Sequence, residues 1–197
     1  MRLLLASKSA ARRAMLEAAG VSFEIVDAEL DEEAGKAGLW GAGFDARGVA
    51  EELAQLKALS VRAGPGDLVL GCDQTLERDD GTLLSKPASR EEACGQLESL
   101  RGSTHKLHSA AVVAENGEGV WWASETVELT MRSFSDGFLA DYLDAEWEQI
   151  RWSVGGYRIE GPGVQLFDRI EGSHFAILGL PLLPLLAYLR ERGMMPA

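Results

Sequence analysis

Two short apolar segments limit the folds open to this chain more than any other feature of its sequence. Residues 2–6 and 67–72 are rich in leucine, and neither alternates polar with apolar residues as a half-exposed strand does. Such runs are typical of strands that are buried on both faces of a parallel sheet by the helices that connect them. We therefore predict an α/β fold.

The rest of the chain alternates predicted helices and strands. Ser9 caps an amphipathic helix over residues 10–19, residues 21–26 form a second strand, and residues 45–63 return to helical spacing. Residues 27–44 lack clear periodicity and are predicted to be an ordered loop. The later elements are helices over 89–100, 135–143 and 182–192, a hairpin of strands 106–114 and 120–131 turning at Asn116-Gly117, and a glycine-rich strand and loop over 153–167.

Length and composition favour a single domain over residues 1–197. The chain is 46% hydrophobic, which is enough to bury a substantial core, and it contains no repeat, low-complexity tract or evident linker. We expect one mixed α/β unit with a cleft between its N- and C-terminal portions.

The charge of the chain excludes one broad class of function. A net charge of -12 argues against a nucleic-acid-binding protein, because affinity for a phosphate backbone needs clustered lysine and arginine. Any anion that this chain binds should be small and held by a few local cations.

The sequence also predicts a cytoplasmic protein without membrane contact. Cys72 and Cys94 are too few for a disulfide framework and are typical of a reducing compartment. The N-terminal apolar run of about five residues is shorter than the ~7 to 15 of a signal-peptide core. The apolar stretch 175–189 falls short of the ~20 residues that span a bilayer and contains two prolines, so it belongs to the core or to an interface.

The first 16 residues are basic in a chain that is otherwise acidic. Arg2, Lys8, Arg12 and Arg13 occur there without a single aspartate or glutamate. The loop Ser7-Lys8-Ser9 leads into a helix N-terminus, where free backbone N–H groups and the helix dipole favour an anion such as phosphate. The alternative is an N-cap serine followed by solvated arginines.

Asp73 is the main candidate for a catalytic or metal-binding carboxylate. It ends an apolar strand, where a carboxylate is costly to bury unless it is paired or binds a cation. Ligands of α/β sheets bind at the carboxyl ends of strands. The acidic cluster 31–33 could supply a second carboxylate for a magnesium ion, or it could be a solvated run of charge.

Two lysines complete a set of charges suited to a polyphosphate and its metal. Lys57 lies among apolar residues of its helix, and Lys86 precedes a proline in a predicted turn. Taken singly, each is a common surface residue. Together with the arginines, the helix-capping serine and the carboxylates, they match what phosphoryl chemistry requires.

Rival catalytic motifs are absent. The sequence has no GxxxxGK(S/T) motif, no dinucleotide-binding glycines and no GxSxG motif. His105 and His108 are three residues apart on a predicted strand, which points them to opposite faces, and His174 stands alone.

Eight short motifs, in order along essentially the whole chain, resemble those of the Maf family of nucleoside triphosphate pyrophosphatases. The motifs are Ser7-Lys8-Ser9 to Arg12-Arg13, Asp31-Glu32, Leu53-Ala54 to Lys57-Ala58, Gly71 to Gln74, Lys86-Pro87, Gly102 to His105, Gly155 to Gly161 and Gly179-Leu180-Pro181. The resemblance implies a mixed sheet flanked by helices, of the Maf and inosine-triphosphatase type, with two lobes around a central cleft. It also implies a homodimer, a nucleoside triphosphate substrate and a divalent metal, Mg²⁺ or Mn²⁺.

The resemblance assigns roles to particular residues. Asp73 would bind metal or activate water, and Glu32 would bind metal. Phosphate would be bound by Ser9, Arg12, Lys57 and Lys86, with a weaker assignment for Arg13.

Three further positions would govern the choice of base, namely Ala11, Gln74 and Glu160. Gln74 and Glu160 are similar to the branch that prefers 7-methyl-GTP, where a carboxylate can accept from the N1–H and N2–H₂ edge of guanine. That branch has tryptophan where this chain has Ala11, and Trp152 and Ser153 replace the Asp-Lys pair of the family.

These assignments predict hydrolysis of a nucleoside triphosphate between its α- and β-phosphates, with 7-methyl-GTP as the expected substrate. Two alternatives follow from the same resemblance. One is a non-catalytic nucleotide-binding regulator of cell division and septum formation, and the other is a house-cleaning enzyme that removes damaged nucleotides of several kinds.

Overall fold

The computed structural model describes residues 1–196, which form two compact units. Unit 1 comprises Met1–Gln74, His108–Thr126 and the chain from Ser173 to the C-terminal end of the described residues. Unit 2 comprises Thr75–Leu107 and Val127–Gly172.

A seven-stranded mixed sheet runs through the chain, as the apolar segments predict. The order is β2 (Glu24–Ile25), β1 (Leu3–Ala6), β3 (Leu68–Glu77), β5 (Thr104–Glu115), β6 (Glu118–Met131) and β7 (Phe167–Glu171), with β4 (Leu83–Leu84) beside β3. Strand β1 is parallel to β2 and to β3, whereas β4 pairs antiparallel with β3 and β7 antiparallel with β6.

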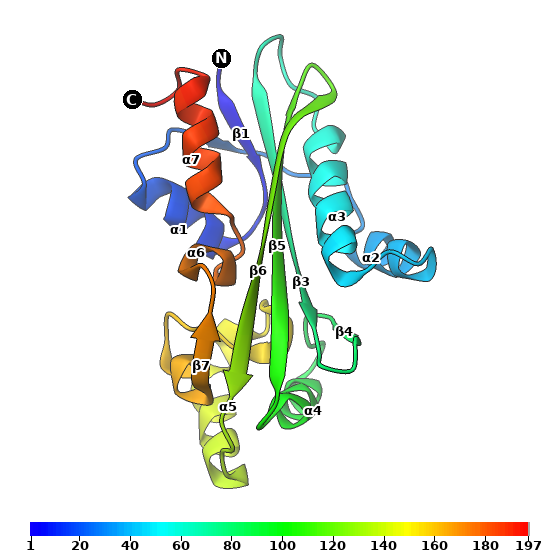
Figure 1. Ribbon diagram of the computed structural model, residues 1–197, viewed down its shortest axis with the longest axis vertical. Coiled ribbons are helices and arrows are strands. Elements are labelled where there is room, and N and C mark those ends of the chain that lie inside the picture. The colour runs from blue at the N-terminus through cyan, green and yellow to red at the C-terminus, as the bar shows by residue number, and fades with distance from the viewer. Residues whose placement is uncertain (197) are drawn as a thin grey trace. The chain divides into compact units, whose positions relative to one another are not determined.

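In unit 1, helices cover both faces of the strands (Figure 1). Helices α1 (Ala10–Ala18) and α7 (Leu182–Glu191) lie on one side, and α3 (Ala46–Ser60) lies on the other. On β3, Leu68, Leu70 and Cys72 pack in the same cluster as α1 and α7, whereas Val69 packs with the alanines of α3. Because side chains alternate along a strand, Asp73 extends toward the α3 face and Gln74 toward the opposite one.

The C-terminal apolar stretch belongs to the core of unit 1. Leu180, Leu185 and Leu189 are fully buried and pack in the cluster that includes α1 and β3. The core alternative therefore holds for most of this segment, which forms α6 (His174–Ile177) and α7.

Unit 2 packs two helices and two short turns against its part of the sheet. They are α4 (Arg90–Leu100), α5 (Asp136–Ile150), and the 3₁₀ turns η1 (Val154–Gly156) and η2 (Pro162–Leu166). Ser89 and Ser135 cap α4 and α5 through their side chains. Leu97, Leu129 and Leu139 are among its buried residues.

Several predicted elements are wrong in type or length. The strand predicted over 67–72 continues to Glu77, so Asp73 lies within β3 and does not end it, and the helix predicted over 135–143 continues to Ile150. Residues 27–44 are not a loop throughout, because α2 (Glu32–Gly41) forms there, with the Asp31 side chain accepting from the Ala34 N–H. None of the residues of α2 is buried, so its sequence carries no apolar stripe that would show helical spacing. The strand predicted over 21–26 shortens to the two exposed residues of β2, and residues 153–167 form 3₁₀ turns instead of a strand.

The predicted hairpin is confirmed. Asn116 and Gly117 both have positive φ, 53° and 83°, as the two-residue turn of a twisted hairpin requires.

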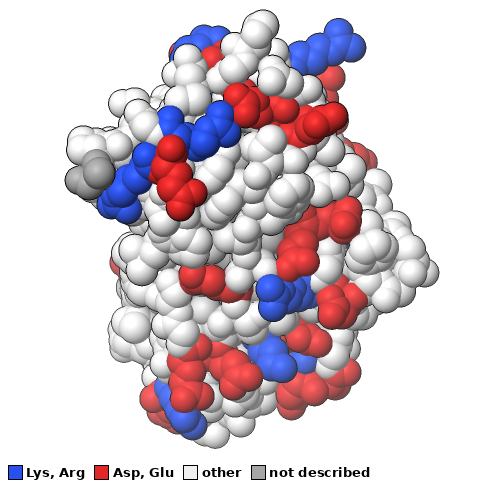
Figure 2. Space-filling view, turned by 45° about the horizontal axis from the view of Figure 1, so that its top comes forward, with Lys and Arg blue, Asp and Glu red and all other residues white. Residues whose placement is uncertain are grey.

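No helix within residues 1–196 has the length and hydropathy needed to cross a bilayer. On the face shown in Figure 2, lysine and arginine side chains are interspersed with the more abundant acidic ones.

Candidate active site

The middle of β3 carries a buried ion pair. Asp73 is 8% exposed, and its Oδ1 lies 2.5 Å from Nζ of Lys57, which is 3% exposed. The same ammonium lies 3.0 Å from Oε1 of Glu32, at the start of α2, and 3.4 Å from the carbonyl oxygen of Cys72. The middle of β3, the last turn of α3 and the first residue of α2 thus bring two carboxylates to one ammonium group.

A glycine explains how α3 delivers Lys57 to this position. A Cβ atom on Gly71 would lie 2.1 Å from the Ala54 carbonyl oxygen and 2.5 Å from the Ala58 nitrogen. The backbone of α3 therefore rests directly on β3, two residues before Asp73. This contact places the lysine stem beside the strand, so that its ammonium reaches the carboxylate.

Arg12 is the second buried cation of unit 1, at 8% exposure. Its Nε donates to the carbonyl oxygen of Gly179 at 2.7 Å, and its Nη1 donates to Ser7 Oγ at 3.2 Å and to the Cys72 carbonyl oxygen at 3.1 Å. Within residues 1–196 it forms no ion pair, so its charge meets only neutral acceptors. A buried charge that lacks an opposite charge is costly unless a ligand supplies one.

The remaining residues of the basic N-terminal segment play lesser parts. Ser9 caps α1, with its Oγ accepting from the Arg12 N–H at 3.3 Å. Arg13 is exposed and lies 4.0 Å from Glu17, and Lys8 is exposed and pairs with Asp27 at 3.4 Å. Arg13 and Lys8 are therefore solvated, as the second interpretation of this segment holds, whereas Arg12 is buried, and anion binding by this segment stays a prediction.

Cys72 joins the two cations through its backbone. Its carbonyl oxygen accepts hydrogen bonds from both the Arg12 guanidinium and the Lys57 ammonium, so the two cations lie close together. Burial raises the pKa of its thiol to about 11, against the opposing effect of the two cations. The thiol is therefore neutral and serves for packing, not as a nucleophile.

Gln74 and Ala11 lie on the other side of the strands from Lys57. The Gln74 amide nitrogen donates to Ser109 Oγ at 2.9 Å and to the carbonyl oxygens of Ala176 and Ile177, at 2.9 Å and 3.0 Å. Ala11 is half-buried in the first turn of α1. Sequence reasoning missed Ser109 and assigned no role to Gly179, although Gly179 belongs to one of the eight motifs.

Unit 1 therefore brings together Arg12, Lys57, Asp73 and Glu32. Lys86 and Glu160 are exposed residues of unit 2, the first after β4 and the second just before η2. Their predicted roles in binding phosphate and base remain predictions.

The histidines take no part in this cluster. His105 is buried in unit 2, where its Nε2 lies 2.7 Å from the Tyr157 hydroxyl. Burial lowers its pKa to about 4, so its ring is neutral at pH 7. No group of three or more histidine, cysteine or acidic side chains within residues 1–196 is arranged to hold a metal ion by itself.

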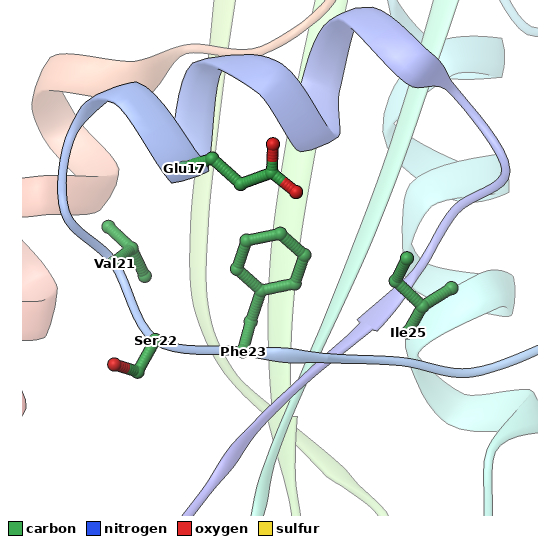
Figure 3. A pocket seen from close by; sticks show the side chains of 5 residues that line it. All are labelled: Glu17, Val21, Ser22, Phe23 and Ile25. Carbon is green, nitrogen blue, oxygen red and sulfur yellow. The ribbon is translucent and has the colours of Figure 1, made fainter.

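A surface pocket elsewhere in unit 1 has the wrong chemistry for a polyanion. It lies between α1 and the segment leading into β2, and Figure 3 shows the Glu17 carboxylate beside the ring of Phe23. Its lining residues are Glu17, Val21, Ser22, Phe23 and Ile25, none of which is a cation or a predicted site residue.

The fold and the site define an α/β protein with a buried cationic cluster, next to a pair of carboxylates, in the middle of a central strand. Comparison with known families matches residues 2–192 to the family described as Maf-like protein. The chain belongs to this family.

Relatives resemble the chain over nearly its full length. A nucleoside triphosphate pyrophosphatase of Sphingopyxis alaskensis is 48% identical over 197 residues, which cover 100% of both chains. One of Caulobacter vibrioides is 49% identical over 189 residues, 96% of this chain and 94% of the relative. A 7-methyl-GTP pyrophosphatase of Brucella abortus is 44% identical over 192 residues, 97% of this chain and 96% of the relative.

Proposed function

We propose that this protein is a nucleoside triphosphate pyrophosphatase, which cleaves its substrate between the α- and β-phosphates to a nucleoside monophosphate and pyrophosphate. The observation that carries the proposal is the buried guanidinium of Arg12, which has no carboxylate partner within residues 1–196 and shares a carbonyl with Lys57. An anion of several charges suits this arrangement. The names of the relatives point to the same reaction.

Asp73 is the proposed general base. Lys57 holds its Oδ1 at 2.5 Å, which leaves Oδ2 to accept a proton from the water that attacks the α-phosphorus. Arg12 and Lys57 neutralise the charge that develops on the pyrophosphate leaving group, and the leaving group takes a proton from solvent.

The carboxylates of Asp73 and Glu32 fit a divalent metal bound together with the substrate. Both lie within 3.0 Å of the Lys57 ammonium nitrogen, so they converge on one point of unit 1. Mg²⁺ commonly takes one or two carboxylates and completes its shell with phosphate oxygens and water, so a third protein ligand is not needed. When bound, the metal would supply charge neutralisation on the phosphates.

We propose 7-methyl-GTP as the preferred substrate within this class. The support is the pair of hydrogen-bond acceptors that Gln74 and Glu160 offer, together with the names of the Brucella relatives at 44% identity. A carboxylate at Glu160 suits a cationic methylated guanine better than a neutral base.

A substrate panel tests the proposal. The purified protein is incubated with normal and modified nucleoside triphosphates, including 7-methyl-GTP, with and without Mg²⁺, and pyrophosphate release is measured. We expect stoichiometric pyrophosphate and monophosphate, greatest with 7-methyl-GTP and dependent on the metal. Nucleotide binding without any pyrophosphate would support a non-catalytic regulator instead, and equal rates on many modified bases would support a house-cleaning enzyme.

A further inference from the structure

Side-chain hydrogen bonds tie the α6 turn of unit 1 to β3 and β5. The Ala176 carbonyl oxygen accepts from three donors, namely Ser109 Oγ at 2.6 Å, Gln74 Nε2 at 2.9 Å and the Gly179 N–H at 3.0 Å. Ser109 is fully buried, and the next carbonyl, of Ile177, also accepts from Gln74 at 3.0 Å. A short four-residue helix is thus anchored at its C-terminal end, where helix carbonyls otherwise lack partners.

The chemistry of these acceptors fixes the orientation of the Gln74 amide. Two of its three partners are carbonyl oxygens, which cannot donate, so only the NH₂ end of the amide can face them. Ser109 completes the arrangement, because its single proton goes to Ala176 and its oxygen is left to accept from Gln74. The NH₂ group is consumed within the protein, and the atom that remains for a ligand is the acceptor Oε1.

The same turn also holds Arg12, the cation proposed to bind phosphate. The Gly179 carbonyl oxygen accepts from Arg12 Nε at 2.7 Å. Gly179 has a φ of 94°, and a Cβ there would lie 3.1 Å from two nitrogens of that guanidinium, so the position requires glycine. One turn therefore anchors both a base-contacting amide and Arg12.

We infer that Ser109 is a positioning residue that locks the Gln74 amide with its carbonyl oxygen toward the nucleobase, so that the site selects bases that present an N–H donor there. The inference rests on the proposed function, since it names how that site reads its base. Ser109 itself touches no substrate and acts through Gln74 and the α6 turn.

A double-mutant cycle tests whether Ser109 acts on base selection through Gln74. The variants are Ser109→Ala, Gln74→Ala and the double variant. The substrates are GTP, 1-methyl-GTP, which lacks the N1 proton, and ITP, which lacks the N2 amine. One of these two groups of guanine, the N1–H or the N2 amine, would donate to Gln74 Oε1. We expect kcat/KM of the wild-type protein to fall at least about tenfold for the substrate that lacks that donor, because Oε1 then stays desolvated without a partner. Ser109→Ala should reduce this discrimination about fivefold, mostly through KM for GTP, and the double variant should match Gln74→Ala.

Two further variants separate positioning from packing. Ser109→Thr keeps the hydroxyl and should restore most of the discrimination. Ser124→Ala removes another side-chain hydroxyl of unit 1, one bonded to Arg47 and Glu51, and should leave the substrate ratios unchanged.

The outcomes are distinct. Equal substrate ratios in Ser109→Ala and wild type, or additive effects in the double variant, would overturn the inference while leaving the proposed function intact. A wild-type protein that releases no pyrophosphate from any triphosphate would overturn the proposed function. If Ser109→Ala does not fold, NMR of the wild-type side-chain amides decides, with the Gln74 resonance assigned from its absence in Gln74→Ala. We expect the Gln74 amide protons to exchange slowly with solvent, and fast exchange would overturn the inference that Ser109 fixes this amide.

Discussion

The two units bury different kinds of polar side chain. Every charged residue that is buried within residues 1–196 belongs to unit 1, whereas unit 2 buries the uncharged Thr75, Gln96 and His105. The buried charges are Arg12, Lys57, Asp67 and Asp73. Buried charge is costly, so its concentration in one unit indicates where the protein meets a charged ligand.

Unit 1 also contains a contrast between an aspartate just before β3 and an aspartate in its middle. Asp67 precedes the strand and pairs with Arg2 at 2.6 Å, a side chain that is 57% exposed. Contact with Arg2 lowers the pKa of Asp67, as expected of a carboxylate in a structural pair. Asp73 instead pairs with the buried Lys57, and the carbonyl oxygen of the preceding Cys72 accepts from both Lys57 and Arg12.

The largest expected effect separates these two aspartates. Asp73→Asn removes the proposed base while keeping its shape, so turnover should fall about 10²- to 10⁴-fold. Asp67→Asn is the matched control, because it should lower stability and leave turnover near that of wild type. Pyrophosphate release gives the rates, and circular dichroism checks the fold. Full turnover in a folded Asp73→Asn protein would remove Asp73 from the role of base.

Arg12 should contribute to substrate binding more than to folding. Arg12→Gln keeps a donor for the neighbouring carbonyls but loses the charge, so KM should rise about 10- to 100-fold, the range for charge-assisted hydrogen bonds. The rise in unfolding temperature caused by a bound nucleotide should shrink in parallel. Arg47→Gln, at an exposed arginine paired with Glu51, should change neither quantity. An unchanged KM in Arg12→Gln would show that the buried charge is structural.

Unit 2 should respond to acid through its buried neutral histidine. The folded-state pKa of His105 is lowered to about 4, from an ordinary value near 6.5, because burial penalises the charged ring. The unfolded chain therefore binds the proton first, so the stabilising contribution is complete above pH ~6.5 and is lost as the pH falls toward 4. Between pH 6.5 and 5 the loss should be about 2 kcal/mol.

Urea unfolding at several pH values measures this contribution. His105→Gln should lose this part of the pH dependence, whereas His174→Gln, at an exposed position, should retain it. Parallel pH profiles for wild type and His105→Gln would contradict a neutral, buried His105.

Much of the fold was predictable because local signals agreed with burial. Ser9 and Ser89 cap helices where the sequence places them, and Asn116-Gly117 turns the hairpin. Helix α2 was not predicted because none of its residues is buried. Its sequence therefore indicates a helix only through residue propensities and the Asp31 cap. In the same way, the glycines of 153–167 break the chain into 3₁₀ turns that have no periodicity to detect.

The candidate site was predictable in its residue types but not in its partnerships. Charge inversion near Arg12 and the polar residues after Cys72 pointed to Arg12 and Asp73, which lie close together in the structure. The Lys57–Asp73 pair depends on how closely a helix approaches a strand, and hydrophobic spacing does not report that distance. The available signal was Gly71, a glycine inside a buried strand, which indicates close approach of another backbone.

A substitution on β3 tests that close approach directly. Gly71→Ala introduces a Cβ that would lie 2.1 Å from the Ala54 carbonyl oxygen, and backbone cannot move aside as a flexible side chain can. Overpacking of this kind should lower the free energy of unfolding by about 1–3 kcal/mol. Because α3 must shift away from β3, Lys57 should also move from Asp73, and turnover should fall more than the loss of folded protein explains.

Gly38→Ala provides the opposite case. Gly38 lies within the exposed helix α2, and a Cβ added there would have no other atom within 4 Å, so alanine should stabilise the protein by about 0.5–1 kcal/mol through helix propensity. Urea denaturation and pyrophosphate release on the two variants measure both effects. A Gly71→Ala protein as stable and as active as wild type would mean that α3 can retreat from β3 without displacing Lys57, and that the ion pair is held by its charges alone.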